Sequence, residues 1–259
     1  MTGALPSGTV TFVFTDIEGS TKLLQELGDD YAQVARDHRA IVRAAFAEHD
    51  GTEIDTQGDS FFYSFRRARD AVAAAVEAQR RLDAHGWPQD RTVRVRMGLH
   101  TGEPTVGDEG YLGMDVVRAA RISAAGNGGQ ILLSETTRAL LGNDLPENVS
   151  IHDLGRQNLK DIQHEQIYEL ALDDRPAISR PLKTESADSR ADAMAKRFEE
   201  RVTAYVEQQL EAAFEGKGVK PPEVPVGLAA KGLGIAGLAL LMLVVVAVVA
   251  ALLVKVVFF

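Results

Sequence analysis

Hydrophobic and polar residues in the first two thirds of the chain follow two different periods. Over residues 9–15, Val10, Phe12 and Phe14 alternate with threonines, which predicts a β-strand. From Tyr31 onward, apolar residues recur at three- and four-residue steps up to Gly51, which predicts an amphipathic helix. The same reasoning predicts further strands over 52–56, 60–65, 93–99, 130–133, 149–154 and 167–172, and helices over 68–85, 114–125 and 135–141.

The order of these elements is βαββαβ followed by additional strands, which indicates an α+β fold. We expect a ferredoxin-like sandwich, in which helices back one mostly antiparallel sheet. Ser20 or Thr21 is expected to cap the helix that follows the first strand. Residues 93–99 alternate apolar residues with Arg94 and Arg96, which predicts a strand with one face in solvent.

The composition changes beyond residue 172. Residues 173–190 are polar and contain proline, and we interpret them as a flexible linker. Apolar residues line one side of a predicted amphipathic helix over 191–215. This helix either packs on the domain or a membrane surface, or forms a dimerising stalk. Residues 216–231 form a second linker, which contains proline and glycine.

The segment 232–254 carries no charge and lies between Lys231 and Lys255. A helix of this length extends about 34 Å, enough to cross a hydrocarbon core of about 30 Å. We therefore expect a single transmembrane helix that anchors the C-terminal tail in the cell membrane; a buried core helix is the alternative. More lysines precede the segment than follow it, so the positive-inside bias places residues 1–231 in the cytoplasm.

Composition narrows the function classes. The 259 residues contain no cysteine, which excludes disulfides, zinc–thiolate sites and a cysteine nucleophile. The net charge is −9, and no basic face is concentrated in the sequence, so we expect no nucleic-acid partner. A triphosphate ligand would therefore need a metal ion to balance its charge.

Two aspartates stand at the ends of predicted strands. Asp16 closes the first apolar run, and Asp59 opens another directly after Gly58. Two carboxylates at neighbouring strand ends indicate a divalent-metal site. Gly19 and Ser20 follow at the start of a predicted helix, where backbone N–H groups are able to hold a phosphate. The combination indicates metal-assisted chemistry on a nucleoside triphosphate.

Six motifs occur in an order that resembles the catalytic domain of class III nucleotidyl cyclases, the adenylate and guanylate cyclase family. The resemblance covers residues 8–172 and implies a homodimer with active sites at the subunit interface. It also implies that two metal ions guide attack of the ribose 3′-hydroxyl on the α-phosphorus. The motifs are FTDIEGST (14–21), QGDSFFYSF (57–65), GLHTGEP (98–104), EGYLGMDVVRAARI (109–122), GGQILLS (128–134) and DLG…LKD…IYEL (153–170).

The resemblance assigns roles to individual residues near the first motif. Asp16 and Asp59 match the two metal-binding aspartates, and the carbonyl of Ile17 matches the backbone ligand. Hard oxygen ligands suit Mg²⁺ or Mn²⁺, two ions per site, so the chemistry of these residues agrees with the implied role. Gly19 and Ser20 would lie at the phosphates.

The resemblance also assigns roles to a residue of the predicted helix 114–125 and to the positions that read the base. Arg121 matches the arginine that stabilises the transition state from the opposite subunit. Three positions depart from the adenylate cyclase pattern. The adenine-reading lysine is replaced by Asp55, the second base-reading residue by Gly110, and the ribose-orienting asparagine by Val117.

Asp55 has a direct chemical interpretation. A carboxylate only accepts hydrogen bonds, which suits the N–H groups of guanine or uracil and disfavours adenine. The alternative is that Asp55 caps the hairpin and touches no ligand. Loss of the ribose asparagine at Val117 should slow turnover, because misplaced reactants forfeit effective concentration.

Together these observations predict a membrane-anchored homodimeric nucleotide cyclase that uses GTP or UTP and releases pyrophosphate. Retention of Asp16, Asp59 and Arg121 favours the enzyme. The alternatives are an adenylate cyclase of low activity and a catalytically degenerate dimer that binds nucleotide as a sensor or scaffold. Asp55, Gly110 and Val117 favour the scaffold.

Overall fold

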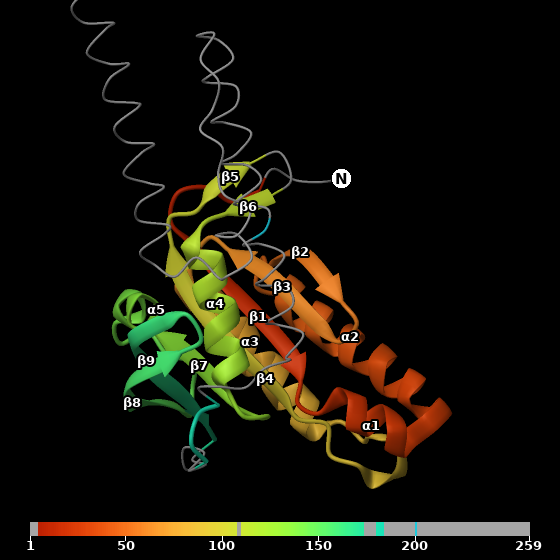
Figure 1. Cartoon of the computed structure of the whole chain (residues 1–259). Coiled ribbons are helices and arrows are strands. Elements are labelled where there is room, and N and C mark those ends of the chain that lie inside the picture. Colours follow the sequence, from red (N-terminus) through yellow and green to blue (C-terminus); the bar gives the residue numbers. More distant parts are fainter. Residues whose placement is uncertain (1–4, 108–109, 174–179, 184–199, 201–259) are drawn as a thin grey trace, which may run out of the picture. The chain divides into compact units, whose positions relative to one another are not determined.

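A computed structural model describes residues 5–107, 110–173, 180–183 and 200 of the chain (Figure 1). Most of the predicted elements are present. The helices are α1 (Ser20–Leu27), α2 (Tyr31–Ala47), α3 (Ala68–Ala84), α4 (Met114–Ala125) and α5 (Glu135–Leu141), with short 3₁₀ turns at Gly28–Asp30 and Pro88–Asp90. The strands are β1 (Val10–Ile17), β2 (Thr52–Gln57), β3 (Ser60–Phe65), β4 (Val95–Gly102), β5 (Thr105–Gly107), β6 (Gly110–Leu112), β7 (Ile131–Ser134), β8 (Val149–Leu159) and β9 (Ile162–Leu172).

Seven of the strands form one sheet in the order β2-β3-β1-β4-β7-β9-β8. Every neighbouring pair is antiparallel except β4 and β7, which are parallel. Strands β5 and β6 pair separately as a short antiparallel ribbon. The mostly antiparallel sheet of an α+β fold is therefore confirmed.

Helices cover both faces of the central strands (Figure 1). Apolar residues of α2, α3 and α5 pack against one face, which includes Val13 of β1. Helix α4 packs against the other face, where Phe12 and Phe14 of β1 are completely buried. Alternate residues of β1 thus contact opposite helical layers, as the period of two along a strand requires.

Two local predictions were wrong. Strand β4 has no solvent face, because α4 covers the side on which its polar residues lie, and Arg96 is only 7% exposed. Neither Ser20 nor Thr21 caps α1: the N-cap residue is Gly19, and no side chain accepts a hydrogen bond there. Strands β8 and β9 also extend further than predicted, since they pair with each other along most of their length.

The predicted transmembrane segment 232–254 and the linker 216–231 lie outside the described residues, as does the predicted helix 191–215 apart from Glu200. Within the part of the chain that is described, no helix combines the length and the apolar character needed to cross a membrane. Of the predicted linker, Asp173 and residues 180–183 are described, and residues 180–183 pack against α4 and its neighbouring strands.

Candidate active site

The C-terminal end of β1 carries a buried ion pair. Asp16 is 2% exposed, and Arg96 of the neighbouring strand β4 donates two hydrogen bonds to it, from Nε at 2.5 Å and from Nη2 at 2.8 Å. The second amino group of Arg96, Nη1, donates to the carbonyl of Ala124 at 2.9 Å, where α4 ends. A bidentate arginine fixes a carboxylate in one orientation. Asp16 is therefore held in place by β4 and by the end of α4.

Asp59 reaches the same strand end from the β2–β3 hairpin. Its Oδ2 accepts the backbone N–H of Ile17 at 3.2 Å, and the residue is 2% exposed. Gly58, directly before it, has a φ of 64°, a left-handed conformation that suits glycine. Arg39 of α2 donates to the Gly58 carbonyl from Nη2 at 2.8 Å and so fixes the turn.

The donor set at this end suits a divalent ion. Asp16, Asp59 and the peptide of Ile17 are brought together at one strand end, as the sequence predicted, and all three are nearly buried. Two carboxylates and a carbonyl are hard oxygen donors of the kind that Mg²⁺ and Mn²⁺ prefer. No group of three or more His, Asp or Glu side chains with ligand geometry occurs in the described residues. A metal here would therefore need the backbone carbonyl and oxygens of the substrate.

The turn after β1 leads directly into α1. Gly19 has a φ of 67°, and Ser20, the first helical residue, is 8% exposed. The N–H groups at the start of a helix are not used within it, so they are available to an anion. Between Ile17 and Gly19, the N–H of Glu18 donates to the carbonyl of Arg94, the residue before β4, at 2.9 Å.

Glu18 has a carboxylate surrounded by cationic and N–H donors. Partial burial alone would raise its pKa, but the opposing effects are stronger and lower the pKa below its ordinary value. These are the hydrogen bond and charge of Lys183, the N–H of Gly128 and the charge of Arg180. The Glu18 side chain remains ionised near neutral pH as a consequence.

Arg121 and Val117 both lie on α4 and are buried, at 3% and 2% exposure. Arg121 Nη2 donates to Asp161 Oδ2 at 3.2 Å. Asp161 lies in the turn between β8 and β9, and strands β4 and β7 separate β9 from β1 in the sheet. Within one chain, Arg121 is thus engaged by this turn. Val117 offers no polar group to a ribose.

The start of α4 is fixed by a buried polar network. His100 of β4 contacts Asp115 Oδ1 through Nε2 at 3.1 Å and Ser134 Oγ through Nδ1 at 2.8 Å. The hydrogen bond from His100 is the main cause that lowers the pKa of Asp115 below its usual range. The N–H of Glu103 donates to the second oxygen of Asp115 at 3.1 Å. The helix that carries Arg121 is therefore anchored to β4 and β7.

Asp55 lies on the edge strand β2, next to an irregularity in the β2–β3 register. Its side chain is partly exposed, and Oδ1 accepts the N–H of Thr56 at 2.8 Å. This contact is local, so it leaves the carboxylate near the surface of the sheet edge. Gly110, the other departure from the adenylate cyclase pattern, begins β6 with a φ of 115°.

Sequence reasoning missed Arg96. The alternation along residues 93–99 placed it on a solvent face, whereas in the fold it is buried against Asp16. The signal that could have found it is the pairing of the strand that carries Asp16 with the strand that carries Arg96. A charged residue on a central strand requires an opposite charge beside it when a helix covers that face.

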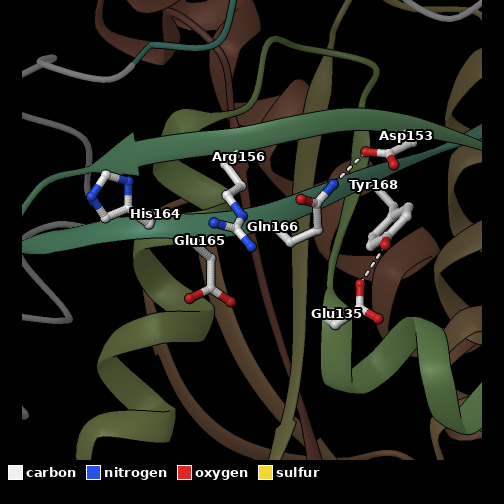
Figure 2. A pocket seen from close by; sticks show the side chains of 7 residues that line it. All are labelled: Glu135, Asp153, Arg156, His164, Glu165, Gln166 and Tyr168. Carbon is white, nitrogen blue, oxygen red and sulfur yellow. Dashed lines mark hydrogen bonds between the residues drawn. The ribbon is translucent and has the colours of Figure 1, made fainter.

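A separate open hollow of about 480 Å³ lies on the β8–β9 hairpin and next to α5 (Figure 2). Figure 2 shows that Gln166 contacts Asp153 and that Tyr168 contacts Glu135. None of the predicted site residues lines this hollow. Its other lining residues are Arg156, His164 and Glu165.

Comparison with known proteins gives a consistent result. The family model described as the adenylate and guanylate cyclase catalytic domain matches residues 4–171. An uncharacterised protein of Mycobacterium tuberculosis is 36% identical over 182 residues, which cover 69% of this chain and 61% of that protein. An adenylate cyclase of Lachancea kluyveri is 32% identical over 156 residues, 51% of this chain and 8% of that protein.

Among solved structures, an adenylate cyclase of Trypanosoma brucei in its monomeric state superposes with a TM-score of 0.62 at 25% identity. This match covers 71% of the present chain and 98% of the trypanosomal one. The chain spans 61% of the length of its mycobacterial relative and a small part of the fungal one. The similarity lies in the same residues that form the sheet and its helices.

Proposed function

Because the chain belongs to the adenylate and guanylate cyclase catalytic domain family, we propose that it converts a nucleoside triphosphate to a 3′,5′-cyclic nucleotide and pyrophosphate. In this reaction the ribose 3′-oxygen bonds to the α-phosphorus, and the bond from that phosphorus to the bridging oxygen breaks. Pyrophosphate leaves, and the hydroxyl proton passes to solvent. The observation that carries the proposal is the convergence of Asp16, Ile17 and Asp59 at one strand end.

Each of these residues has a task in the proposed reaction. Asp16 and Asp59, with the Ile17 carbonyl, would hold two Mg²⁺ or Mn²⁺ ions. Bound there, the ions would lower the pKa of the 3′-hydroxyl and neutralise triphosphate charge. The N–H groups at Gly19 and Ser20 would orient the phosphates. Arg96 keeps Asp16 oriented, because both of its hydrogen bonds must be satisfied in the same plane.

The proposed enzyme is a homodimer with shared sites. The family pattern has Arg121 act on the substrate of the opposite subunit. In one chain, the side chain of Arg121 is engaged by Asp161 of the β8–β9 turn, which is separated from β1 by two strands. This arrangement supports a site that is completed by a second copy of the chain. The proposed role of Arg121 is to stabilise charge on the α-phosphate.

The proposed base is guanine or uracil. Asp55 is partly exposed at the sheet edge and only accepts hydrogen bonds, which matches the N1–H of guanine or the N3–H of uracil. A low-activity adenylate cyclase is the alternative that the fungal relative favours. A nucleotide-binding scaffold without turnover is the alternative that Val117 favours, since this buried residue cannot orient the ribose.

The proposed location is the cytoplasmic face of the cell membrane. It rests on the uncharged segment 232–254 and on the lysines that precede it. Separation of membranes from soluble material after alkaline washing tests this point. Recovery of the full chain in the washed soluble fraction would contradict it.

The activity is tested with the purified full chain in detergent. Each of the four nucleoside triphosphates is supplied with Mn²⁺ or Mg²⁺, and the products are separated by mass. Cyclic GMP or cyclic UMP is the expected main product, and the Asp59→Ala protein should form it about 10²–10³-fold less efficiently. Cyclic AMP as main product would support the low-activity adenylate cyclase. Absence of every cyclic product, with nucleotide binding retained, would support the scaffold.

A further inference from the structure

Residues Arg180, Pro181, Leu182 and Lys183, here called the strap, lie against the catalytic domain. They follow β9 in the sequence and belong to a stretch that reads as a linker. Backbone contacts attach the strap to the end of α4: the N–H of Lys183 donates to the Ala125 carbonyl at 2.8 Å. Asn127 Nδ2 donates to the Pro181 carbonyl at 3.1 Å.

The strap also has an apolar anchor. Leu182 packs against a buried cluster that includes Ile122 of α4, Leu132 of β7 and Ile162 of β9. The loop below the strap is itself rigidly held. Asn127 is 3% exposed, and its N–H donates to the side chain of Gln130 at 2.7 Å. The strap therefore packs on a loop around Asn127 that is itself fixed by hydrogen bonds, here called the platform. A chance contact of an exposed linker would not have such support.

The charged end of the strap reaches the loop between the proposed metal ligands and the phosphate turn. Lys183 Nζ forms an ion pair with Glu18 Oε1, and Arg180 Nη2 lies 3.7 Å from Glu18 Oε2. Glu18 is partly buried, with 22% of its side chain exposed. It directly follows Ile17 and precedes Gly19. Two cations from outside the catalytic motifs thus converge on one carboxylate within them.

The platform is also connected to Asp16. Arg96, which holds Asp16, donates through Nη1 to the carbonyls of Ala124 at 2.9 Å and Gly126 at 3.4 Å. The strap binds the next groups along the same loop, at Ala125 and Asn127. Lifting the strap would therefore act on the metal end by two routes, through Glu18 and through the partners of Arg96.

We propose that Glu18 is a positioning residue of the cyclase reaction, and that Lys183 of the strap fixes it so that the loop from Asp16 to Ser20 is ordered for metal and triphosphate. Glu18 acts through its neighbours and takes no part in bond making. The inference rests on the proposed function, because it assigns Glu18 to the proposed metal and phosphate loop. It also means that Lys183, which lies outside the six sequence motifs, is joined directly to this loop.

The test is a double-mutant cycle in the full chain. It compares wild type, Lys183→Ala, Glu18→Gln and the double variant. Each single change should weaken Mn²⁺ binding, measured without nucleotide from the electron paramagnetic resonance signal of free Mn²⁺, by about threefold to tenfold. The double variant should bind like Glu18→Gln alone, because Lys183 acts through Glu18. Lys183→Arg should retain wild-type affinity.

Three controls separate this role from a general loss of stability. Arg69→Ala removes one partner of an exposed ion pair with Asp144 and should leave Mn²⁺ binding unchanged. Leu182→Asn removes the apolar contact of the strap without adding a charge and should reproduce the effect of Lys183→Ala. Steady-state kinetics should show a lower kcat for both strap variants, whereas a purely structural role would lower the melting temperature alone.

Hydrogen exchange gives a readout that needs neither metal nor turnover. In the Lys183→Ala protein, amides of residues 17–23 should exchange about threefold to tenfold faster than in wild type, while those of β9 stay unchanged. Unchanged exchange at residues 17–23, or independent effects of Lys183→Ala and Glu18→Gln on Mn²⁺ binding, would overturn the proposal. If wild type binds no Mn²⁺ yet the exchange responds, the strap contact stands and the proposed metal site fails.

Discussion

The proposed metal end, at Asp16 and Asp59, and the proposed base-reading side, at Asp55, differ in burial and in the contacts that one chain provides. Asp16 and Asp59 are both 2% exposed, and their hydrogen-bond partners come from β4 and β1. Asp55 lies at the sheet edge, partly exposed, and its local partner is the N–H of the next residue. Asp16 and Asp59 thus form a buried cluster with fixed partners, whereas Asp55 lies on an open surface.

This difference explains where the family pattern is kept and where it is lost. A buried carboxylate that loses its partner leaves an uncompensated charge, so substitutions at the metal end are costly. A side chain at an exposed edge can change its chemistry at little cost to the fold. On the proposed assignment, base preference is therefore able to vary while the proposed metal site stays constant. The predictions below test the two regions against each other.

Arg96→Met should have the largest effect on stability. It leaves Asp16 buried without its bidentate partner, which costs about 3–5 kcal/mol. Urea unfolding measures the loss. Arg94→Met, an exposed neighbour on the same stretch, is the matched control and should change stability by less than about 0.5 kcal/mol. Equal losses in the two variants would show that the metal end is not specially constrained.

Asp59→Ala should lower kcat/KM by about 10²–10³-fold, because it removes a charge that would hold the metal ions. The expected circular dichroism spectrum is that of wild type. Asp29→Ala, an exposed aspartate in the turn after α1, serves as control and should retain activity. Full activity in a folded Asp59→Ala protein would remove the metal end from the mechanism.

Mixing Asp16→Ala and Arg121→Ala proteins should restore activity that neither has alone. In the heterodimer, one of the two shared sites contains an intact Asp16 and an intact Arg121. The other site contains both substitutions. Random exchange of subunits should therefore recover about a quarter of wild-type activity. An inactive mixture in which a heterodimer is shown by native mass spectrometry would contradict the shared site.

Asp55→Lys should shift base preference toward ATP by about tenfold, because a donor replaces an acceptor at the sheet edge. The measurement is the ratio of kcat/KM for ATP to that for GTP. Asp29→Lys, at an exposed position in the turn after α1, changes the net charge by the same amount and is the control for charge alone. If both variants shift the ratio equally, Asp55 has no specific contact with the base.

Acid should lower the stability of the packing around His38, which lies close to Asp59. His38 of α2 is fully buried, packs on Phe61 two residues after Asp59, and has no hydrogen-bond partner for either ring nitrogen in the described structure. Burial, with a smaller contribution from the charge of Arg39, lowers the pKa of His38 to about 4. The residue is thus neutral in the folded protein at pH 7.

The sign of the pH effect follows from this shift. Between the unfolded pKa of about 6.5 and the folded value, the unfolded chain binds more protons, so the free energy of unfolding falls as the pH decreases. The slope for one group approaches about 1.4 kcal/mol per pH unit. The free energy of unfolding of the His38→Met protein should lack this pH-dependent contribution. Parallel stability curves for the two proteins from pH 7 to pH 4.5 would show that His38 does not titrate with unfolding.

Several parts of the fold and site could be predicted because their causes are local. The threonine and phenylalanine alternation defined β1, and the three- and four-residue spacing from Tyr31 defined α2. Asp16 and Asp59 could be placed together since each stands at the end of a strand in a short βαββ unit. The contact of Arg96 with Asp16 could not be predicted. Alternation along a strand was taken to mean that one face is exposed to solvent, and the sequence does not say that α4 covers that face.

The sequence by itself determined the order of elements, the family motifs and the oxygen-donor chemistry of the proposed metal site, because these depend on residue type and spacing along the chain. Only the tertiary structure decided that Arg96 grips Asp16, that Asp161 engages Arg121, and that Lys183 reaches Glu18. These contacts join residues far apart in sequence. Their partners are selected by the packing of α4 and the strap on the sheet, and that packing depends on burial rather than on local propensity.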